Sequence, residues 1–156
     1  MTVRVLFVCL GNICRSPMAE AVFQHLVDEA GLSDAIQVDS AGTSGWHVGE
    51  TAHRGTRAVL SQHGISYAGR ARQIMSADFD RFDYILAMDS SNLSDLRQML
   101  PPDSDSVVKR FLDFADDVST RDVPDPYYDG RFEHVYQLVQ RGAQTLLDTI
   151  REEEGL

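Results

Sequence analysis

Apolar runs alternate with amphipathic stretches along the chain, and this pattern predicts an α/β fold. Four short runs, at residues 4–8, 36–39, 83–87 and 107–111, are apolar and rich in β-branched or aromatic residues, as buried strands are. Apolar positions recur at helical spacing in four stretches, at residues 17–29, 54–63, 91–99 and 132–151. We therefore expect one domain, residues 1–156, with a four-stranded parallel, doubly wound sheet flanked by helices, which binds ligands beyond the carboxyl ends of its strands.

The first strand leads directly into the sequence Cys-Leu-Gly-Asn-Ile-Cys-Arg-Ser-Pro, residues 9–17. Ser16 and Pro17 are typical of a helix start, with a capping hydroxyl before the residue favoured at the first helical position. Residues 9–15 then form the turn between strand and helix. Such a turn can direct its backbone N–H groups at one anion, with the positive end of the helix dipole behind them. Arg15 adds a planar, bidentate donor for phosphate oxygens.

Cys9 is the candidate nucleophile of this turn. A thiol at a helix N-terminus and beside an arginine has its thiolate stabilised, and such settings lower the pKa of a cysteine from about 8.5 to roughly 3.5–7.5. Alone, Cys9 could equally be a buried core thiol. Gly11 and Asn12 favour the anion site, because these residue types most easily adopt the left-handed conformations that a loop wrapped around an anion needs.

A second candidate constellation lies at residues 123–129, Val-Pro-Asp-Pro-Tyr-Tyr-Asp. Two prolines bracket Asp125 and stiffen the loop that holds it. If a phosphoryl group is transferred to Cys9, Asp125 could protonate the leaving group and later deprotonate the attacking water. Tyr127, Tyr128 and Trp46 could line the site and stack on a substrate ring. Without Cys9, Asp-Pro would be read as an ordinary turn, and Trp46 could instead cover the edge of the core.

Composition and charge narrow the function classes. The chain has 156 residues, of which 43% are hydrophobic, which suits one domain with a full core. Two cysteines are too few for a disulfide scaffold, and we expect neither export nor a membrane span, so the predicted location is cytoplasmic. A formal net charge of −10 argues against nucleic acid and anionic lipid as partners. The acidic residues at 103–129 and 152–154 are expected to form a solvated face.

Four segments together resemble the low-molecular-weight protein tyrosine phosphatases. They are the sequence at 9–17, Asp-Ser-Ala-Gly-Thr-Ser-Gly-Trp at 39–46, Tyr-Ile-Leu-Ala-Met-Asp-Ser-Ser-Asn-Leu at 84–93, and Asp-Pro-Tyr-Tyr at 125–128. The resemblance runs from about residue 3 to about residue 150. It implies the phosphotyrosine phosphatase I fold, hydrolysis of phosphotyrosine and small aryl phosphates through a cysteinyl-phosphate intermediate, and no metal or other cofactor.

The resemblance also implies a role for individual residues. Cys9 would be the nucleophile, Arg15 would bind the phosphate oxygens, and Asp125 would be general acid and then base. Ser16 would donate a hydrogen bond to the sulfur of Cys9, while Ser40 and Asp89 would support the loop. The substrate-binding set would be Leu10, Gly11, Asn12, Ile13, Cys14, Ser16, Trp46, Tyr127 and Tyr128. Phosphotyrosine proteins, a cognate tyrosine kinase and free phosphate are the implied partners of a chain that we expect to be a monomer.

The roles of two positions, Cys14 and Gly69, are less clear from the resemblance alone. Cys14 resembles the family's second cysteine, which can form a reversible disulfide with the nucleophile, but a small apolar filler is an equally good interpretation. Gly69 stands where many members have a histidine that braces the phosphate loop. We therefore expect a water or another side chain to support the loop in this chain.

Three other classes are weighed against this hypothesis. A thioredoxin-coupled arsenate reductase would need further cysteines downstream, and this chain has none after Cys14. A module that only binds phosphotyrosine would need neither the thiol of Cys9 nor the carboxyl of Asp125. A dinucleotide-binding domain would carry Gly-x-Gly-x-x-Gly after its first strand, and residues 9–16 do not.

Overall fold

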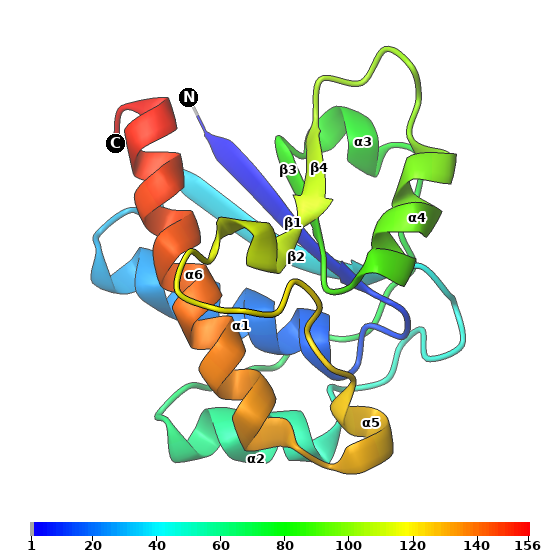
Figure 1. Cartoon of the computed structure of the whole chain (residues 1–156), viewed down its shortest axis with the longest axis vertical. Helices are drawn as coiled ribbons and strands as arrows, with labels where there is room; N and C mark the ends of the chain where they lie inside the picture. The colour runs from blue at the N-terminus through cyan, green and yellow to red at the C-terminus, as the bar shows by residue number, and fades with distance from the viewer. Residues whose placement is uncertain (1) are drawn as a thin grey trace.

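The apolar runs of the sequence pair as one sheet in the computed structural model, which describes residues 2–156 (Figure 1). The sheet has the strand order β2-β1-β3-β4, and all three neighbouring pairs are parallel. The elements in chain order are β1 (Val3–Cys9), α1 (Arg15–Glu29), β2 (Ile36–Gly42), α2 (Arg54–Gln62), α3 (Asp78–Arg81), β3 (Tyr84–Ala87), α4 (Ser90–Met99), β4 (Val107–Arg110), the 3-10 helix η1 (Phe111–Phe114), α5 (Pro126–Asp129) and α6 (Phe132–Glu154). The predicted four-stranded parallel sheet is confirmed.

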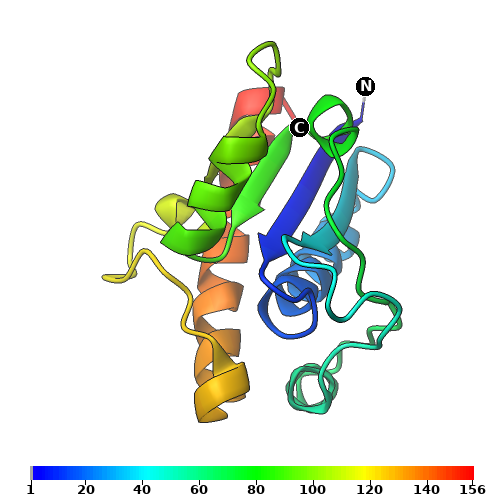
Figure 2. The ribbon, with the colours of Figure 1, turned by 90° about the vertical axis from the view of Figure 1, so that its right-hand side faces the viewer.

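Strand β1 separates two apolar layers because its side chains alternate between the faces of the sheet. Val5 and Phe7 belong to the layer formed with α1 and α6, where Phe7 packs edge-on against Phe23 and Phe111. Leu6 and Val8 belong to the smaller layer formed with β3, α3 and α4. Figure 2 shows α4 on one side of the sheet and α1 with α6 on the other. Strand β1 is therefore packed on both faces, which fixes the position of its carboxyl end.

Two of the element boundaries that differ from the prediction lie next to the loop after β1. Helix α1 begins at Arg15, two residues before the expected start, and no side chain caps it. The hydroxyl of Ser16 is therefore not the helix cap, and it contacts Cys9 instead. Strand β2 continues to Gly42, so that residues 40–42 are strand and not loop. It is extended because residues 36–42 pair in register with the full length of β1.

Three short elements were not predicted from the sequence, namely α3, η1 and α5. Each has only four residues, too few for a helical period to stand out. The predicted fourth strand is also shorter than expected, because Phe111 starts η1 and turns into the core.

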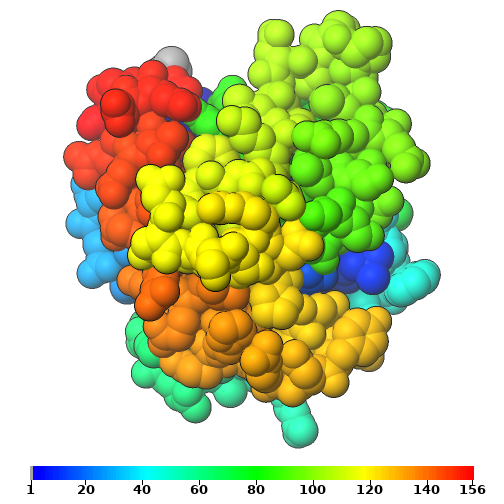
Figure 3. Space-filling model, in the orientation of Figure 1, coloured from blue at the N-terminus to red at the C-terminus, as the bar shows by residue number. Residues whose placement is uncertain are grey.

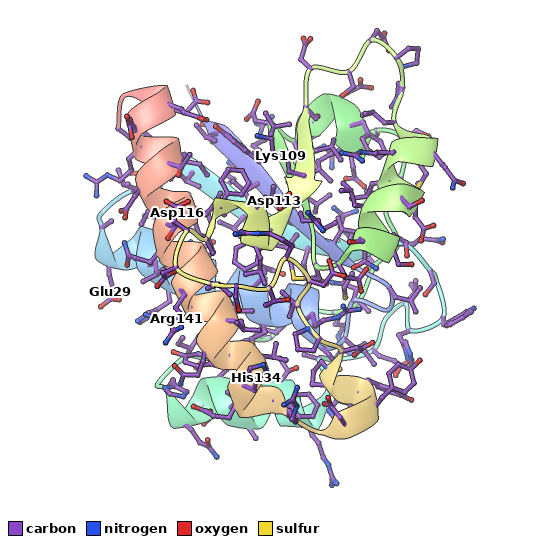
Figure 4. The ribbon with its side chains drawn as sticks, in the orientation of Figure 1. Glu29, Lys109, Asp113, Asp116, His134 and Arg141 are labelled. Atoms are coloured by element: carbon purple, nitrogen blue, oxygen red, sulfur yellow. The ribbon has the colours of Figure 1, made fainter. Side chains whose placement is uncertain are left out.

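The acidic segment is solvated, as expected. Most of its carboxylates are exposed, Asp113 and Asp116 among them, and Figure 4 labels Asp113 close to Lys109. In the described part of the chain, no helix combines the length and apolar character needed to cross a membrane.

Candidate active site

The segment after β1 folds into a loop between the strand and the N-terminus of α1. Asn12 adopts the left-handed conformation, with φ of 57°, as the sequence suggested for this position. Its backbone N–H points at the sulfur of Cys9 across 3.3 Å. Gly42 lets this loop approach β2, since a Cβ there would lie 2.8 Å from the carbonyl oxygen of Leu10. The loop thus curls over the end of the sheet with Cys9 at its centre.

Cys9 meets a hydroxyl as well as a backbone donor. Its sulfur lies 3.0 Å from Oγ of Ser16, and both residues are buried. Asn12 donates from Nδ2 to Ser16 at 2.8 Å and to Ser40 at 3.0 Å. The first N–H groups of α1 are not satisfied by any side-chain cap, so they are suited to an anion held by the loop.

Arg15 is held as a rigid donor on the wall of the site. Its Nη1 donates to Oδ2 of Asp89 at 2.6 Å and to the carbonyl oxygen of Val123 at 3.0 Å. Burial acts to lower the pKa of Arg15, but Cys9, Asp89 and Asp125 outweigh it and raise the pKa. Because Nη1 is engaged in this way, the Nε and Nη2 edge is the one that can bind two oxygens of a phosphate.

Asp125 faces Arg15 from the opposite wall. Its Oδ2 lies 3.5 Å from Nη2 of Arg15, and its Oδ1 accepts the backbone N–H of Tyr127, so that Asp125 caps α5. The rigid Pro-Asp-Pro segment therefore aims one oxygen of Asp125 into the site while the other is fixed by the helix. This is the arrangement that a positioned acid or base requires.

These groups share one cavity of about 240 Å³. Cys9 forms its floor together with Leu10, Gly11, Ile13 and Cys14, and its walls are Arg15, Asp125, Trp46, His47, Tyr127 and Tyr128. Trp46 and Tyr128 are highly exposed, with 78% and 80% of their surface accessible. Figure 3 shows the surface of the loop after β1 emerging between the segments of α4 and α5. The site is thus a pocket with the thiol of Cys9 at its floor and an aromatic rim.

Cys14 also lines this cavity but is a poor candidate for ionisation. Burial raises the pKa of its thiol to about 12, and the negative charges of Cys9 and Asp125 add to the effect. Cys9 and Cys14 are both free thiols. Cys14 is therefore a neutral side chain beside the candidate nucleophile.

Not every expected substrate-binding side chain points into the cavity. Those of Asn12 and Ser16 lie behind the loop, where they hydrogen-bond to one another. Ser40 and Asp89 lie where loop support was expected, against Asn12 and Arg15 respectively.

Sequence reasoning did not assign His47, Glu20, Tyr67 or Arg72 to the site. His47 lines the cavity, Arg72 donates its backbone N–H to Asn12 of the loop, and Glu20 and Tyr67 connect to the loop through Ser40. The glycine at position 69 was a signal for Tyr67 alone. A Cβ on Gly69 would collide with the hydroxyl of Tyr67, which occupies the space next to it. A side chain at position 69 would therefore displace Tyr67.

Comparisons with known proteins agree with this geometry. Residues 4–155 match the family described as low molecular weight phosphotyrosine protein phosphatase. The protein-tyrosine-phosphatase YfkJ of Bacillus subtilis is 51% identical over 155 residues, which cover 99% of each chain. Its crystal structure has a TM-score of 0.94 to this chain and covers 98% of it and 97% of the YfkJ chain.

Two further solved structures are more distant in sequence. A protein tyrosine phosphatase from Entamoeba histolytica, with Hepes in its active site, is 37% identical with a TM-score of 0.92, over 99% of both chains. A Drosophila arginine phosphatase is also 37% identical, with a TM-score of 0.89, over 94% of this chain and 97% of its own. From its fold, its pocket and these matches, the chain belongs to the low molecular weight phosphotyrosine protein phosphatase family.

Proposed function

We propose that this chain hydrolyses phosphotyrosine monoesters in two steps, with Cys9 as nucleophile. The observation that carries the proposal is the floor of the cavity, where the sulfur of Cys9 faces the N-terminus of α1 beside the guanidinium of Arg15. A dianionic phosphate bound there would meet backbone donors and Arg15 on one side and the sulfur on the other.

In the first step the thiolate of Cys9 attacks phosphorus, and the bond between phosphorus and the tyrosyl oxygen breaks. Asp125 gives its proton to the departing phenoxide, so that tyrosine leaves as a neutral phenol. Arg15 binds the equatorial oxygens of the transferring group, over which the charge is spread in the transition state. The product of this step is a phosphate covalently bound to Cys9.

In the second step water attacks the phosphorus of this intermediate. Asp125, now ionised, takes a proton from the water, and the bond between sulfur and phosphorus breaks. The hydroxyl of Ser16, 3.0 Å from the sulfur, can donate to the thiolate as it leaves. Inorganic phosphate is released, and the thiolate is restored for another cycle.

The aromatic rim supports a phosphate ester on an aromatic ring. Tyr127 and Tyr128 meet edge to face with ring centroids 5.4 Å apart, and Trp46 lines the same cavity. A phenyl ring entering phosphate-first would pass between these side chains and bury apolar surface against them. We therefore propose phosphotyrosine proteins as substrates, prepared by a tyrosine kinase, for a cytoplasmic monomer whose two free thiols suit a reducing compartment.

The test compares substrates on wild-type protein and on Cys9→Ser, with a metal chelator present. We expect turnover of phosphotyrosine peptide and of 4-nitrophenyl phosphate, inhibition by orthovanadate, and no turnover by Cys9→Ser. Phosphoarginine is a necessary competitor in the assay, because one similar structure is that of an arginine phosphatase. A higher kcat/KM for phosphoarginine than for phosphotyrosine would overturn the proposed substrate, and turnover by Cys9→Ser would overturn the mechanism.

A further inference from the structure

A chain of hydrogen bonds leads from the outside of α1 to the sulfur of Cys9. Glu20, one helical turn after Ser16, accepts at Oε1 from the hydroxyl of Ser40 at 2.6 Å and from that of Tyr67 at 2.8 Å. Ser40 accepts from Asn12, Asn12 donates to Ser16, and Ser16 contacts Cys9. The side chains of α1, β2 and the loop after α2 thus join behind the phosphate site.

Asn12 can be oriented in only one way within this chain. Its Oδ1 accepts the backbone N–H of Arg72 at 3.0 Å, which can only donate. The amide nitrogen must then face Ser40 and Ser16, and both of its hydrogens are used on their oxygens. Ser16 therefore receives a hydrogen bond from Asn12 and has its own hydrogen free for the sulfur of Cys9.

At the end of the chain far from Cys9, Glu20 fixes which way the hydroxyl of Ser40 donates. An ionised carboxyl only accepts, so Ser40 donates to Glu20 and offers its lone pairs to Asn12. Tyr67 holds the same oxygen of Glu20, and burial raises the pKa of the tyrosine, so that it remains a neutral donor. The space that Tyr67 occupies exists because position 69 is a glycine.

We propose that Tyr67 and Glu20 are positioning residues that act through Ser40, Asn12 and Ser16 to keep a hydroxyl donor on the sulfur of Cys9. The hydrogen bonds then donate outward from Asn12 on both sides, through Ser40 to Glu20 and through Ser16 to the sulfur. The hydroxyl of Ser16 is thereby directed at the sulfur both before attack and when the thiolate departs. The inference rests on the proposed role of Cys9. It assigns loop support to Tyr67, a residue two positions before the glycine that raised the question.

The groups around Glu20 decide whether its carboxyl is ionised and accepts the hydrogen bond from Ser40. Its carboxyl is faced by Ser40, Tyr67, Asp39 and Arg72, and burial is the main cause that raises its pKa. A protonated Glu20 could donate to Ser40, and the hydroxyl of Ser40 would no longer be fixed as the acceptor that anchors Asn12. Removing either the charge of Glu20 or the hydroxyl of Tyr67 should therefore weaken the donor at Cys9.

The experiment uses Tyr67→Phe and Glu20→Gln, each with a matched control at another tyrosine–glutamate pair. Tyr84 donates to Glu153 at 2.7 Å between β3 and the end of α6, so Tyr84→Phe and Glu153→Gln remove the same kinds of group at a place that does not line the cavity. The readouts are kcat and KM for 4-nitrophenyl phosphate, the inhibition constant of inorganic phosphate, and the rate at which iodoacetate alkylates Cys9 across pH.

We expect both Tyr67→Phe and Glu20→Gln to lower kcat by about three- to tenfold, with KM and phosphate inhibition changed by less than about twofold. Alkylation of Cys9 should be slower than in wild type. Both controls should match wild type. Wild-type kcat and alkylation in the two variants, or equal losses in the controls, would overturn the proposal. Alkylation needs no turnover, so this comparison stands even if the chain does not hydrolyse aryl phosphates.

Discussion

At the scale of single residues, Cys9 and Cys14 lie in one cavity but have different surroundings. Burial raises the pKa of Cys14 to about 12, so its thiol is neutral at physiological pH. Only a thiolate reacts quickly with an alkylating agent. We expect iodoacetamide at neutral pH to modify Cys9 alone, as mass spectrometry of the digested protein would show. Cys14→Ser should react as wild type does, and an adduct on Cys14 at a comparable rate would contradict this picture.

Asp125 permits a sharper test of its proposed role. Asp125→Asn removes the acid but keeps an acceptor for the cap of α5. We expect kcat to fall by about a hundredfold for phenyl phosphate, whose leaving group needs the proton, and much less for 4-nitrophenyl phosphate. Asp122→Asn, at an exposed carboxylate that bonds Ser90, is the matched control. Equal losses on both substrates would rule out Asp125 as the acid.

The reactive residues could be predicted from the sequence, but two residues that support the phosphate loop could not. Cys9, Arg15 and Asp125 were assigned from local chemistry, and the structure brings them into one cavity. Glu20 and Tyr67 were missed because a carboxylate on a helix and a tyrosine in a loop carry no signal until the fold places them together. Gly69 indicated that another group must brace the phosphate loop in place of the family's histidine, but it did not indicate which residue.

At the scale of elements, length decided what could be predicted. The long helices α1 and α6 show several turns of apolar periodicity, and the strands are short apolar runs between breakers. The start of α1 was misplaced because Ser16 and Pro17 look like a cap, whereas the helix already begins at Arg15. Asp125 also caps helix α5. From the sequence, Asp125 was expected only as a general acid and base, and not as a helix cap.

The segment from residue 69 to 78 is held by a buried ion pair. Arg72 forms two hydrogen bonds to Asp78, which is fully buried and also accepts the backbone N–H of Met75. Asp78→Asn removes the carboxylate charge and turns an amide donor toward one of the two guanidinium N–H groups, so it should lower the free energy of unfolding by about 3 kcal/mol.

Asp39 binds the same guanidinium but is half-exposed, whereas Asp78 is fully buried, and Asp39 provides the control. Asp39→Asn should cost less than about 1 kcal/mol, as exposed ion pairs do. Urea unfolding of both variants would measure the difference. Equal losses would mean that the ion pair to Asp78 does not clamp this segment, whose backbone also orients Asn12.

At the scale of the whole molecule, stability should depend on pH through Glu20. Its pKa in the folded chain is raised above the ordinary value of 4.5, chiefly by burial. The folded state then binds more protons than the unfolded state as pH rises above that value, so the free energy of unfolding decreases with pH there. As pH rises above 4.5, urea unfolding should show a larger loss of stability for wild type than for Glu20→Gln. An identical loss in both proteins would contradict the assignment.

Several parts of the fold together position the loop between β1 and α1. The two apolar layers fix β1, the helix dipole of α1 faces the loop, and α5 brings Asp125 across the cavity. With a net charge of −10, the chain repels anions at long range, so recognition of phosphate depends on this local arrangement.

The central claim is that the phosphoryl group of the substrate is transferred to Cys9. The most direct measurement is to mix the protein with an aryl phosphate, quench with acid within the first turnover, and find the phosphorylated peptide by mass spectrometry. The account predicts one phosphate on the peptide that contains Cys9, and none in Cys9→Ser. Full turnover by wild type without this adduct, or the adduct on another residue, would contradict it.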